Sequence, residues 1–377
     1  MTTPVAVYVH LPFCPYLCPY CDFAKWPYRA SDATRYLAAL EAQIDASPRR
    51  TATTLFFGGG TPNTYEPATI GALIASVRER FSLPATAEIS LEANPDPALC
   101  LGFPALREAG VNRLSIGAQS FDATELATLG RRHSAEDIAA AVRLARAAGF
   151  DSISLDLMFA IPGQSNASFT RSLEAAFALD VDHVSAYGLT VEEGTPYERW
   201  FARDPGVFFD DEREARLYEI AIERAAAAGY EQYEISNFAR PGKRCAHNAT
   251  YWANGEYVGL GVGAASYIDG VRSVTTRDLA TYVAAASANE TIPAESERLE
   301  GDARLGEATM LALRTLEGVN IADFRERYDV DFLAKFGSVI DTFRSSSLLS
   351  VDAGHVRLTR RGRFLANDVC GAFLSLP

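Results

Sequence analysis

Short apolar segments alternate with longer alanine-rich segments through the first half of the chain. The apolar segments predict strands at residues 5–9, 53–57, 87–91, 112–116, 152–157 and 183–187. The segments between them carry leucines at helical spacing and predict helices at residues 33–45, 67–81, 122–129, 135–148 and 168–178. Ser134 and Asn166 stand where N-caps of the last two helices are expected.

Six strand–helix units in succession predict a parallel sheet with right-handed crossovers. Six units are too few for a complete eight-stranded barrel. We therefore expect an α/β fold whose core is an open, partial (β/α)6 barrel, with a doubly wound open sheet as the alternative.

Polar or glycine-rich residues follow each predicted strand. Active sites of parallel barrels lie at the carboxyl ends of the strands, so these residues are expected to share one face. They occupy residues 14–21, 58–62, 92–95, 117–120, Asp156 with 162–164, and 187–190.

The pattern changes after residue 190. The sequence predicts a charged helix at 210–228, a strand at 231–238, a loop at 240–251 and a glycine-rich segment at 255–270. Residues 288–303 have the composition of a polar linker. The tail predicts helices near 304–316 and 321–327, a strand and turn near 348–359, and a helix from 360.

That order of elements predicts two domains. Residues 1–287 are expected to form the barrel with its extension. Residues 288–377 are expected to form a small, winged-helix-like α+β domain.

Composition narrows the function classes. The 377 residues are 48% hydrophobic and 22% charged, with a net charge of -13. This acidic balance disfavours nucleic acid as a partner, even for a winged-helix-like domain. No apolar run approaches the roughly 20 residues that span a bilayer. The N-terminus has no secretory signal pattern, so we expect a cytoplasmic protein whose membrane association is peripheral at most.

Three of the six cysteines form a tight group, Cys14-Pro-Tyr-Leu-Cys18-Pro-Tyr-Cys21. In a reduced compartment such a group indicates a metal centre. A four-iron cluster usually has four cysteine ligands, and three would leave one iron open to the amine and carboxylate of S-adenosylmethionine (SAM). The alternative is a zinc site with His10 as fourth ligand, but structural zinc prefers paired CxxC motifs and the chain has no second pair.

The CxxxCxxC group after the first strand, followed by Gly-Gly-Gly-Thr-Pro at 58–62, resembles the radical-SAM superfamily. The string Tyr-Val-His-Leu-Pro-Phe-Cys at 8–14 resembles the branch that contains oxygen-independent coproporphyrinogen III oxidase (HemN) and the heme chaperone HemW. The resemblance covers about residues 1–367. It implies a [4Fe–4S] cluster on Cys14, Cys18 and Cys21, and a C-terminal domain of the HemN type.

The resemblance also implies which residues contact SAM. They are Tyr8, Tyr20, Gly60, Thr61, Glu92, Gln119, Arg132, Asp156 and Gly188, with Arg131 as the alternative to Arg132. Carboxylates can bind ribose hydroxyls, and an arginine can pair with the methionine carboxylate.

Three features distinguish the members of this branch. The oxidases carry a further cysteine two residues after the third ligand, where this chain has Phe23, and they have a longer N-terminal extension. Residues 245–252 match the HNxxYW signature of the chaperones, which implies that His247 binds heme. Alternatively, His247 is a structural loop histidine, and Cys245 is a further possible thiolate ligand. We expect His133 and His183 to be structural.

The resemblance therefore favours a heme chaperone that delivers heme to acceptor hemoproteins and receives electrons from a donor such as flavodoxin or ferredoxin. The alternatives are a coproporphyrinogen III oxidase and, more remotely, a radical methylase or other tailoring enzyme. Whether the chain is an enzyme stays open, and no catalytic residue is assigned.

Overall fold

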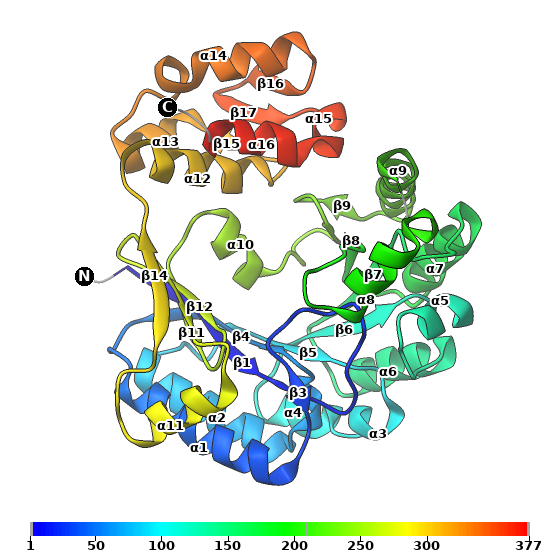
Figure 1. Ribbon diagram of the computed structural model, residues 1–377, viewed down its shortest axis with the longest axis vertical. Coiled ribbons are helices and arrows are strands. Elements are labelled where there is room, and N and C mark those ends of the chain that lie inside the picture. The colour runs from blue at the N-terminus through cyan, green and yellow to red at the C-terminus, as the bar shows by residue number, and fades with distance from the viewer. Residues whose placement is uncertain (1–2, 209, 375–377) are drawn as a thin grey trace.

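The computed structural model describes residues 3–208 and 210–374, and a twelve-stranded sheet is its largest element. The strand order is β14-β13-β12-β11-β1-β4-β5-β6-β7-β8-β10-β9. Its centre is the predicted run of six parallel strands, which curves into an open barrel (Figure 1). These strands are β1 (Val5–Leu11), β4 (Ala52–Gly59), β5 (Glu88–Ala93), β6 (Arg113–Gln119), β7 (Ser152–Phe159) and β8 (His183–Gly188).

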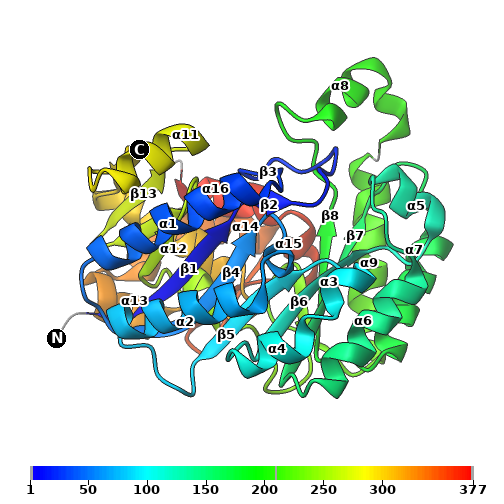
Figure 2. The same ribbon diagram turned by 90° about the horizontal axis from the view of Figure 1, so that it is seen from below.

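Helices cover the outer face of the barrel, as Figure 2 shows. Ser134 caps α6 in a capping box, as expected. The expected Asn166 cap is wrong, because Ser165 takes that position: its hydroxyl accepts the backbone N–H of Ser168 at 3.0 Å, and Asn166 is the first helical residue. The helices are α1 (Ala30–Ala46), α2 (Pro67–Phe81), α3 (Pro97–Cys100), α4 (Phe103–Glu108), α5 (Ala123–Thr128), α6 (Ala135–Ala147) and α7 (Asn166–Ala178).

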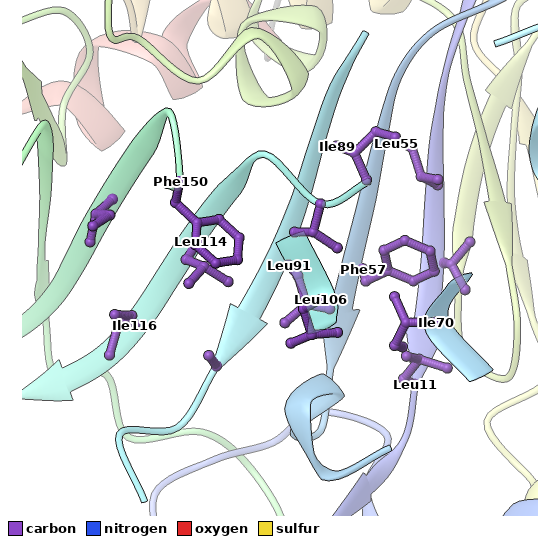
Figure 3. Packing of buried hydrophobic residues seen from close by; sticks show 14 of the residues in the cluster. Leu11, Leu55, Phe57, Ile70, Ile89, Leu91, Leu106, Leu114, Ile116 and Phe150 are labelled. Carbon is purple, nitrogen blue, oxygen red and sulfur yellow. The ribbon is translucent and has the colours of Figure 1, made fainter. Parts of the chain in front are cut away.

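The hydrophobic core lies between these helices and the outward side chains of the strands (Figure 3). Leu55 and Phe57 on β4 and Leu91 on β5 are fully buried beside Ile70 of α2 and Leu106 of α4. Truncating such a leucine to alanine costs about 2–5 kcal/mol. The core therefore sits outside the barrel wall and leaves the inside of the barrel to other side chains.

Both edges of the six-stranded centre are extended. On one side β11 (Tyr257–Leu260) pairs parallel with β1 and is followed by the antiparallel strands β12 (Ala265–Ile268), β13 (Val271–Thr275) and β14 (Ala294–Arg298). On the other side β10 (Asn237–Ala239) pairs antiparallel with β8 and with β9 (Glu231–Gln232). The single strand expected at 231–238 is thus two short strands of a hairpin.

Helices that follow the barrel strands complete the first domain. They are α8 (Pro196–Arg203), α9 (Asp211–Ala227), α10 (Ala246–Trp252) and α11 (Leu279–Ser287), with the 3₁₀ turns η1 (Pro62–Thr64) and η2 (Pro205–Val207) and the two-residue strands β2 (Phe13–Cys14) and β3 (Trp26–Pro27). The loop expected at 240–251 is wrong over its second half, which is α10. The first backbone N–H groups of α10 donate to Glu88 on β5, which is far away in the sequence. No local sequence pattern therefore predicts this helix.

The C-terminal part packs above the barrel as a small α+β unit (Figure 1). Its three-stranded sheet has the order β15-β17-β16, and its separate core is rich in phenylalanine, including Phe324, Phe332, Phe336 and Phe373. The elements are α12 (Gly301–Leu313), β15 (Val319–Asn320), α13 (Ile321–Tyr328), α14 (Phe332–Ser345), β16 (Leu349–Asp352), β17 (His355–Leu358), α15 (Arg360–Phe364) and α16 (Ala366–Leu374). Helix α14 was not predicted.

The domain boundary expected at residue 288 stays a prediction. The polar segment 288–303 contains β14, which hydrogen-bonds to β13 as the last strand of the large sheet. Within the described residues, no helix has the length and apolar character needed to span a membrane.

Candidate functional site

The inner wall of the barrel is polar. Because side chains alternate along a strand, Arg113, Ser115, Gly117 and Gln119 of β6 face inward, while the alternate residues 114, 116 and 118 enter the core. Complete barrels fill this space with branched apolar side chains. Here the inner wall surrounds a cavity of about 700 Å³. The interior of this barrel is therefore a candidate binding site.

The three clustered cysteines line the cavity at the carboxyl ends of the strands. Cys14 is buried at the end of β2, while Cys18 and Cys21 lie partly exposed in the loop that follows. Burial raises the pKa of the Cys14 thiol to about 11. All six cysteines are free thiols.

This donor set fits an iron–sulfur cluster. Among the described residues, no three His, Cys, Asp or Glu side chains gather closely enough to hold one metal ion. A four-iron cluster bonds each cysteine to a different iron, so its ligands do not need to meet at one point. Three thiols around one cavity, with space beside them, suit that geometry.

The glycine run after β4 is fastened to the cysteine loop by backbone hydrogen bonds. Gly60 donates to the carbonyl of Leu11 at 2.8 Å, and Thr61 donates to the carbonyl of Phe13 at 3.0 Å. A Cβ atom at Gly60 would lie 2.7 Å from the carbonyl carbon of Pro12, so only glycine permits this approach. The predicted residues Gly60 and Thr61 both line the cavity.

Two carboxylates, Glu92 on β5 and Asp156 on β7, face the cavity. Glu92 accepts a hydrogen bond from the backbone N–H of Gly59 at 3.0 Å, and the hydroxyl of Ser115 donates to the carboxylate of Asp156, lying 3.0 and 2.9 Å from its two oxygens. Burial, together with the nearby Asp156, raises the pKa of Glu92 to about 7. Burial also raises the pKa of Asp156, against hydrogen bonds from serines. Such acceptors suit hydroxyl or ammonium groups of a ligand.

The two adjacent arginines lie in different surroundings. Arg131 lines the cavity: its Nη2 donates to Asn94 Oδ1 and to the carbonyl of Gly117, both at 2.6 Å, and its Nη1 lies 3.6 Å from Cys18 Sγ. Arg132 is exposed and lies outside the lining, with its guanidinium 4.8 Å from the ring centre of Tyr16. Arg131 is therefore the arginine that faces the cavity, because the turn after α5 directs it inward, and the assignment of either arginine to SAM stays a prediction.

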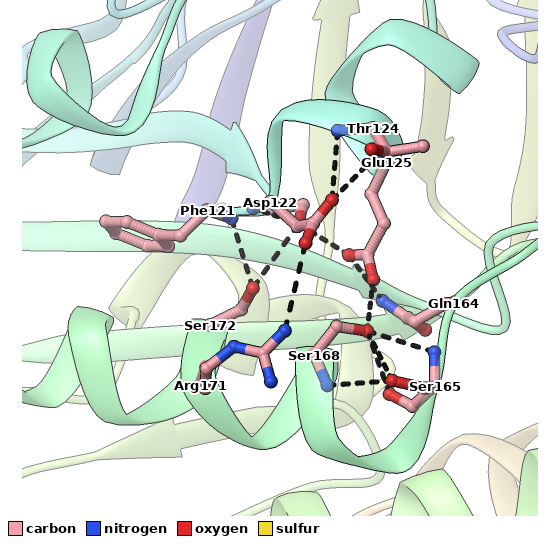
Figure 4. A network of polar contacts seen from close by, with 10 residues as sticks. Phe121, Asp122, Thr124, Glu125, Gln164, Ser165, Ser168, Arg171 and Ser172 are labelled. Atoms are coloured by element: carbon pink, nitrogen blue, oxygen red, sulfur yellow. Dashed lines mark hydrogen bonds and ion pairs between the residues drawn. The ribbon is translucent and has the colours of Figure 1, made fainter.

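A buried polar network around Glu125 lies beyond the ends of β6 and β7 (Figure 4). The carboxylate of Glu125 accepts hydrogen bonds from Ser120 and Ser168, both at 2.6 Å, and from Gln164 at 3.0 Å. These contacts join the segments that follow β6 and β7. Gln119, next to the network, has a φ of 63°, which non-glycine residues seldom adopt, and its side chain faces the cavity.

The other residues expected at the SAM site are distributed as follows. Tyr8 and Tyr20 line the cavity, and the hydroxyl of Tyr8 lies 3.0 Å from Nδ1 of His10. Gly188 ends β8, outside the lining, and a Cβ atom there would lie 2.6 Å from the carboxylate of Glu214. Its role stays a prediction.

His247 reaches the same cavity from α10, towards the amino ends of the strands. Its Nδ1 lies 2.9 Å from the hydroxyl of Thr54, and its Nε2 lies 2.7 Å from the hydroxyl of Tyr251. The ring packs on Phe56 at 5.1 Å between ring centres. Burial lowers the pKa of His247 to about 3, so the imidazole is neutral. Cys245 is buried at the N-cap of α10.

The other two histidines are held by hydrogen bonds. His133 Nε2 lies 3.0 Å from the carbonyl of Ala118. His183 lines the cavity, with Ser154 at 2.8 Å and Tyr233 at 2.9 Å from its two ring nitrogens.

Sequence reasoning missed three residues near the amino ends of the strands. Arg113 lines the cavity, and Thr54 and Glu88 hold α10 through His247. One signal was available: each is a polar residue inside or beside a predicted apolar strand. Their convergence depends on the register between strands, which the sequence does not show.

Known proteins resemble this chain over nearly its full length. Residues 8–176 match the radical SAM superfamily, and residues 299–365 match the HemN C-terminal domain. The chain is 36% identical over 375 residues to the heme chaperone HemW of Bacillus subtilis strain 168, covering 98% of this chain and 99% of that protein. It is 33% identical over 390 residues to HemW of Escherichia coli K12, covering 99% and 98%. Among solved structures, coproporphyrinogen III oxidase (HemN) from Escherichia coli matches with a TM-score of 0.86 and 25% identity, covering 99% of this chain and 91% of that chain.

Proposed function

The chain belongs to the HemW family of the radical SAM superfamily, and on that premise we propose that it is a heme chaperone. It binds a [4Fe–4S] cluster, SAM and heme, and passes the heme to acceptor hemoproteins. The observation that carries the proposal is the shared cavity: the three cysteines and His247 line the same space inside the barrel.

The residues of the cavity have different proposed roles according to their position. Cys14, Cys18 and Cys21 are the cluster ligands at the carboxyl ends of the strands. Gly60 and Thr61 bring backbone close to SAM without a side-chain collision, and Arg131 pairs with its carboxylate. Cluster and SAM together supply one-electron chemistry. The surrounding protein wall limits the access of water to that chemistry.

Glu92 and Asp156 provide the acceptors for SAM hydroxyl or ammonium groups. Glu92 is itself fixed by the backbone N–H of Gly59, so the glycine run and the acid act as one unit. Gln119 adds an amide to the same stretch of wall.

His247 is the proposed heme ligand, since a neutral imidazole is a common ligand of heme iron. Phe56 and Tyr251 beside it offer aromatic surface to a porphyrin. Both ring nitrogens are hydrogen-bonded in this structure, so iron binding at Nε2 would require Tyr251 to release that nitrogen.

Heme titration tests this assignment. Heme should bind to the wild type and its Soret band should shift on binding. With His247→Ala, no such shift should appear. His133→Ala is the matched control, because His133 is also a buried histidine but lies outside the cavity lining. Equal binding and equal spectra for the wild type and His247→Ala would remove His247 as the ligand.

The cluster assignment has its own test. Anaerobically reconstituted wild type should contain close to four irons per chain with a brown chromophore, which Cys14→Ala should lose. Cys100→Ala and Cys370→Ala are the controls, because both cysteines are buried in hydrophobic cores away from the cavity.

An oxygen-independent coproporphyrinogen III oxidase is the second candidate, supported by the likeness in fold to that enzyme. Phe23 stands against it, since the oxidases have a cysteine there. Anaerobic conversion of coproporphyrinogen III to protoporphyrinogen IX by the reconstituted protein would decide for the oxidase.

The chaperone function also carries expectations about the surroundings of the protein. It would work in the cytoplasm and draw electrons from a small carrier such as flavodoxin or ferredoxin. Binding of either carrier to the reconstituted protein is measurable by calorimetry.

A further inference from the structure

A buried arginine without an ionic partner lines the cavity near the amino ends of the strands. Arg113, the first residue of β6, is 3% exposed. Its Nη1 donates to the hydroxyl of Ser152 at 2.8 Å and, at 3.5 Å, to the carbonyl of Lys243. Its Nε has no hydrogen-bond partner among the described residues.

The charge of Arg113 is not neutralised by direct contact. No carboxylate of the described residues forms an ion pair with it, although arginines elsewhere in the chain form many. Arginine stays protonated at any physiological pH, and nearby acidic groups, Glu88 and Asp156 among them, raise the pKa of Arg113 against its burial without touching it. Its guanidinium therefore keeps an N–H group without an acceptor beside the cavity, which suits a polar or anionic group that enters the cavity.

The neighbours of Arg113 leave room for such a group. Glu88 and Asp156 lie near it without contact. The oxygens of Glu88 accept the backbone N–H groups of Ala246 and His247, both at 3.1 Å, so this charge is engaged at the N-terminus of α10. Asp156 is engaged by the hydroxyl of Ser115.

Arg113 is distinct from the arginine at the SAM site. Arg131 is bonded to the carbonyl of Gly117, four residues further along β6. At about 3.3 Å per residue, this places the two points about 13 Å apart along the strand. The single carboxylate of a SAM molecule held at Arg131 therefore does not serve Arg113.

We propose that Arg113 binds a carboxylate of a second molecule held in the barrel. Resting on the proposed function, this second molecule is heme, and the group on Arg113 is one of its propionates. Arg113 donates to the carbonyl of Lys243, which lies two residues before Cys245, the N-cap of α10. The propionate on Arg113 and the proposed iron ligand His247 would therefore be held by the same segment, residues 243–247.

The surroundings favour a carboxylate over a phosphate. A singly charged carboxylate can contact the guanidinium with less repulsion from Glu88 and Asp156 than a phosphate dianion would meet. The aromatic rings of Tyr8 and Phe56, stacked 6.2 Å apart between centres on the adjoining wall, suit a flat apolar body that carries the carboxylate.

Heme and heme dimethyl ester separate the two anchors. Both molecules have the same iron and the same ring, but the ester has no carboxylate. We expect the reconstituted wild type to bind heme about tenfold more tightly than the ester, the usual scale of one charge-assisted contact. Arg113→Gln should bind both with similar, weaker affinity. Arg107→Gln, which removes an arginine paired with Asp151 on the surface, should keep the wild-type preference.

Each outcome is decisive. Equal affinity of the wild type for heme and its ester would overturn the inference without any variant, even if Arg113→Gln failed to fold. A preference that persists in folded Arg113→Gln would also overturn it and leave heme binding through His247 intact. Binding of neither molecule by the wild type would remove the proposed function and this inference with it.

Discussion

The hydroxyl of Tyr251 lies 2.7 Å from Nε2 of His247, one helical turn earlier on α10. Thr54 occupies the other ring nitrogen at 2.9 Å. Since a metal needs a ring nitrogen with a free lone pair, heme iron bound at Nε2 of His247, as proposed above, would compete with Tyr251.

Replacing Tyr251 by phenylalanine should therefore strengthen heme binding. One neutral hydrogen bond contributes about 0.5–1.5 kcal/mol, which corresponds to a roughly 2- to 10-fold gain in affinity for Tyr251→Phe. Soret titration at fixed pH measures it. Tyr257→Phe is the control, because Tyr257 packs on Tyr251 at 4.7 Å between ring centres and has no hydrogen bond to His247. Unchanged or weaker binding by Tyr251→Phe would contradict competition at Nε2.

The adjacent arginines give a matched pair for SAM. Arg131→Gln should lower SAM affinity about 10- to 100-fold, because its guanidinium is directed into the cavity beside Cys18. Arg132→Gln should stay within twofold of the wild type, since Arg132 is exposed and contacts Tyr16. Isothermal titration with the reconstituted protein measures both. A larger loss in Arg132→Gln would restore the original sequence-based choice.

The buried Glu92 should make the stability of the SAM-free protein depend on pH. The pKa of Glu92 is about 7 in the folded protein against 4.5 in the unfolded chain. Between these values the folded state holds a proton that the unfolded chain releases, so the free energy of unfolding falls as the pH rises through this window. Glu92→Gln removes this loss. Because Glu92 lines the cavity, we expect less than the full effect of the pKa shift. The free energy of unfolding of Glu92→Gln should exceed that of the wild type by about 1–2 kcal/mol at pH 8 and by almost nothing at pH 5.

Thermal unfolding of the wild type and Glu92→Gln at pH 5 and pH 8 gives the comparison. A stabilisation of equal size at both pH values would mean that titration of Glu92 is not its cause. The same variant should bind SAM more weakly, because an amide replaces an acceptor carboxylate.

The contact between the glycine run and the cysteine loop predicts a steric effect. Gly60→Ala would force a methyl group against the backbone of Pro12 and should cost about 1–3 kcal/mol, together with a loss of iron after reconstitution. Gly337→Ala is the control: this glycine lies within α14 with nothing within 4 Å of an added Cβ. It should raise stability by about 0.5–1 kcal/mol and leave the iron content unchanged. Equal iron content in both variants would contradict the tight approach at Gly60.

The strands and helices of the barrel could be predicted because each is a local pattern. Apolar runs that end in polar residues located all six central strands, and α2 was predicted at its observed bounds. The cysteine loop was equally accessible, because its ligands lie close together in sequence. These features need no knowledge of which distant residues meet.

The features that were missed depend on tertiary contacts. Helix α10 is only seven residues long and takes its cap from Glu88 on β5. All residues of strand β14 are exposed, and its sequence has no apolar alternation. It forms a strand because it hydrogen-bonds to β13. Arg131 and Arg132 are the same residue type, and only the path of the turn after α5 distinguishes them.

The pairing of β1 also sets an order of events during synthesis. Ala6 pairs with Thr54 on one side and with Tyr257 on the other, so the second neighbour of β1 leaves the ribosome 257 − 6 = 251 residues later. At roughly 5–20 residues per second this delay is on the order of 10–50 s. Until then the strand that leads into Cys14 has an open edge. A truncated chain that ends before β11 would therefore leave this edge of β1 unpaired.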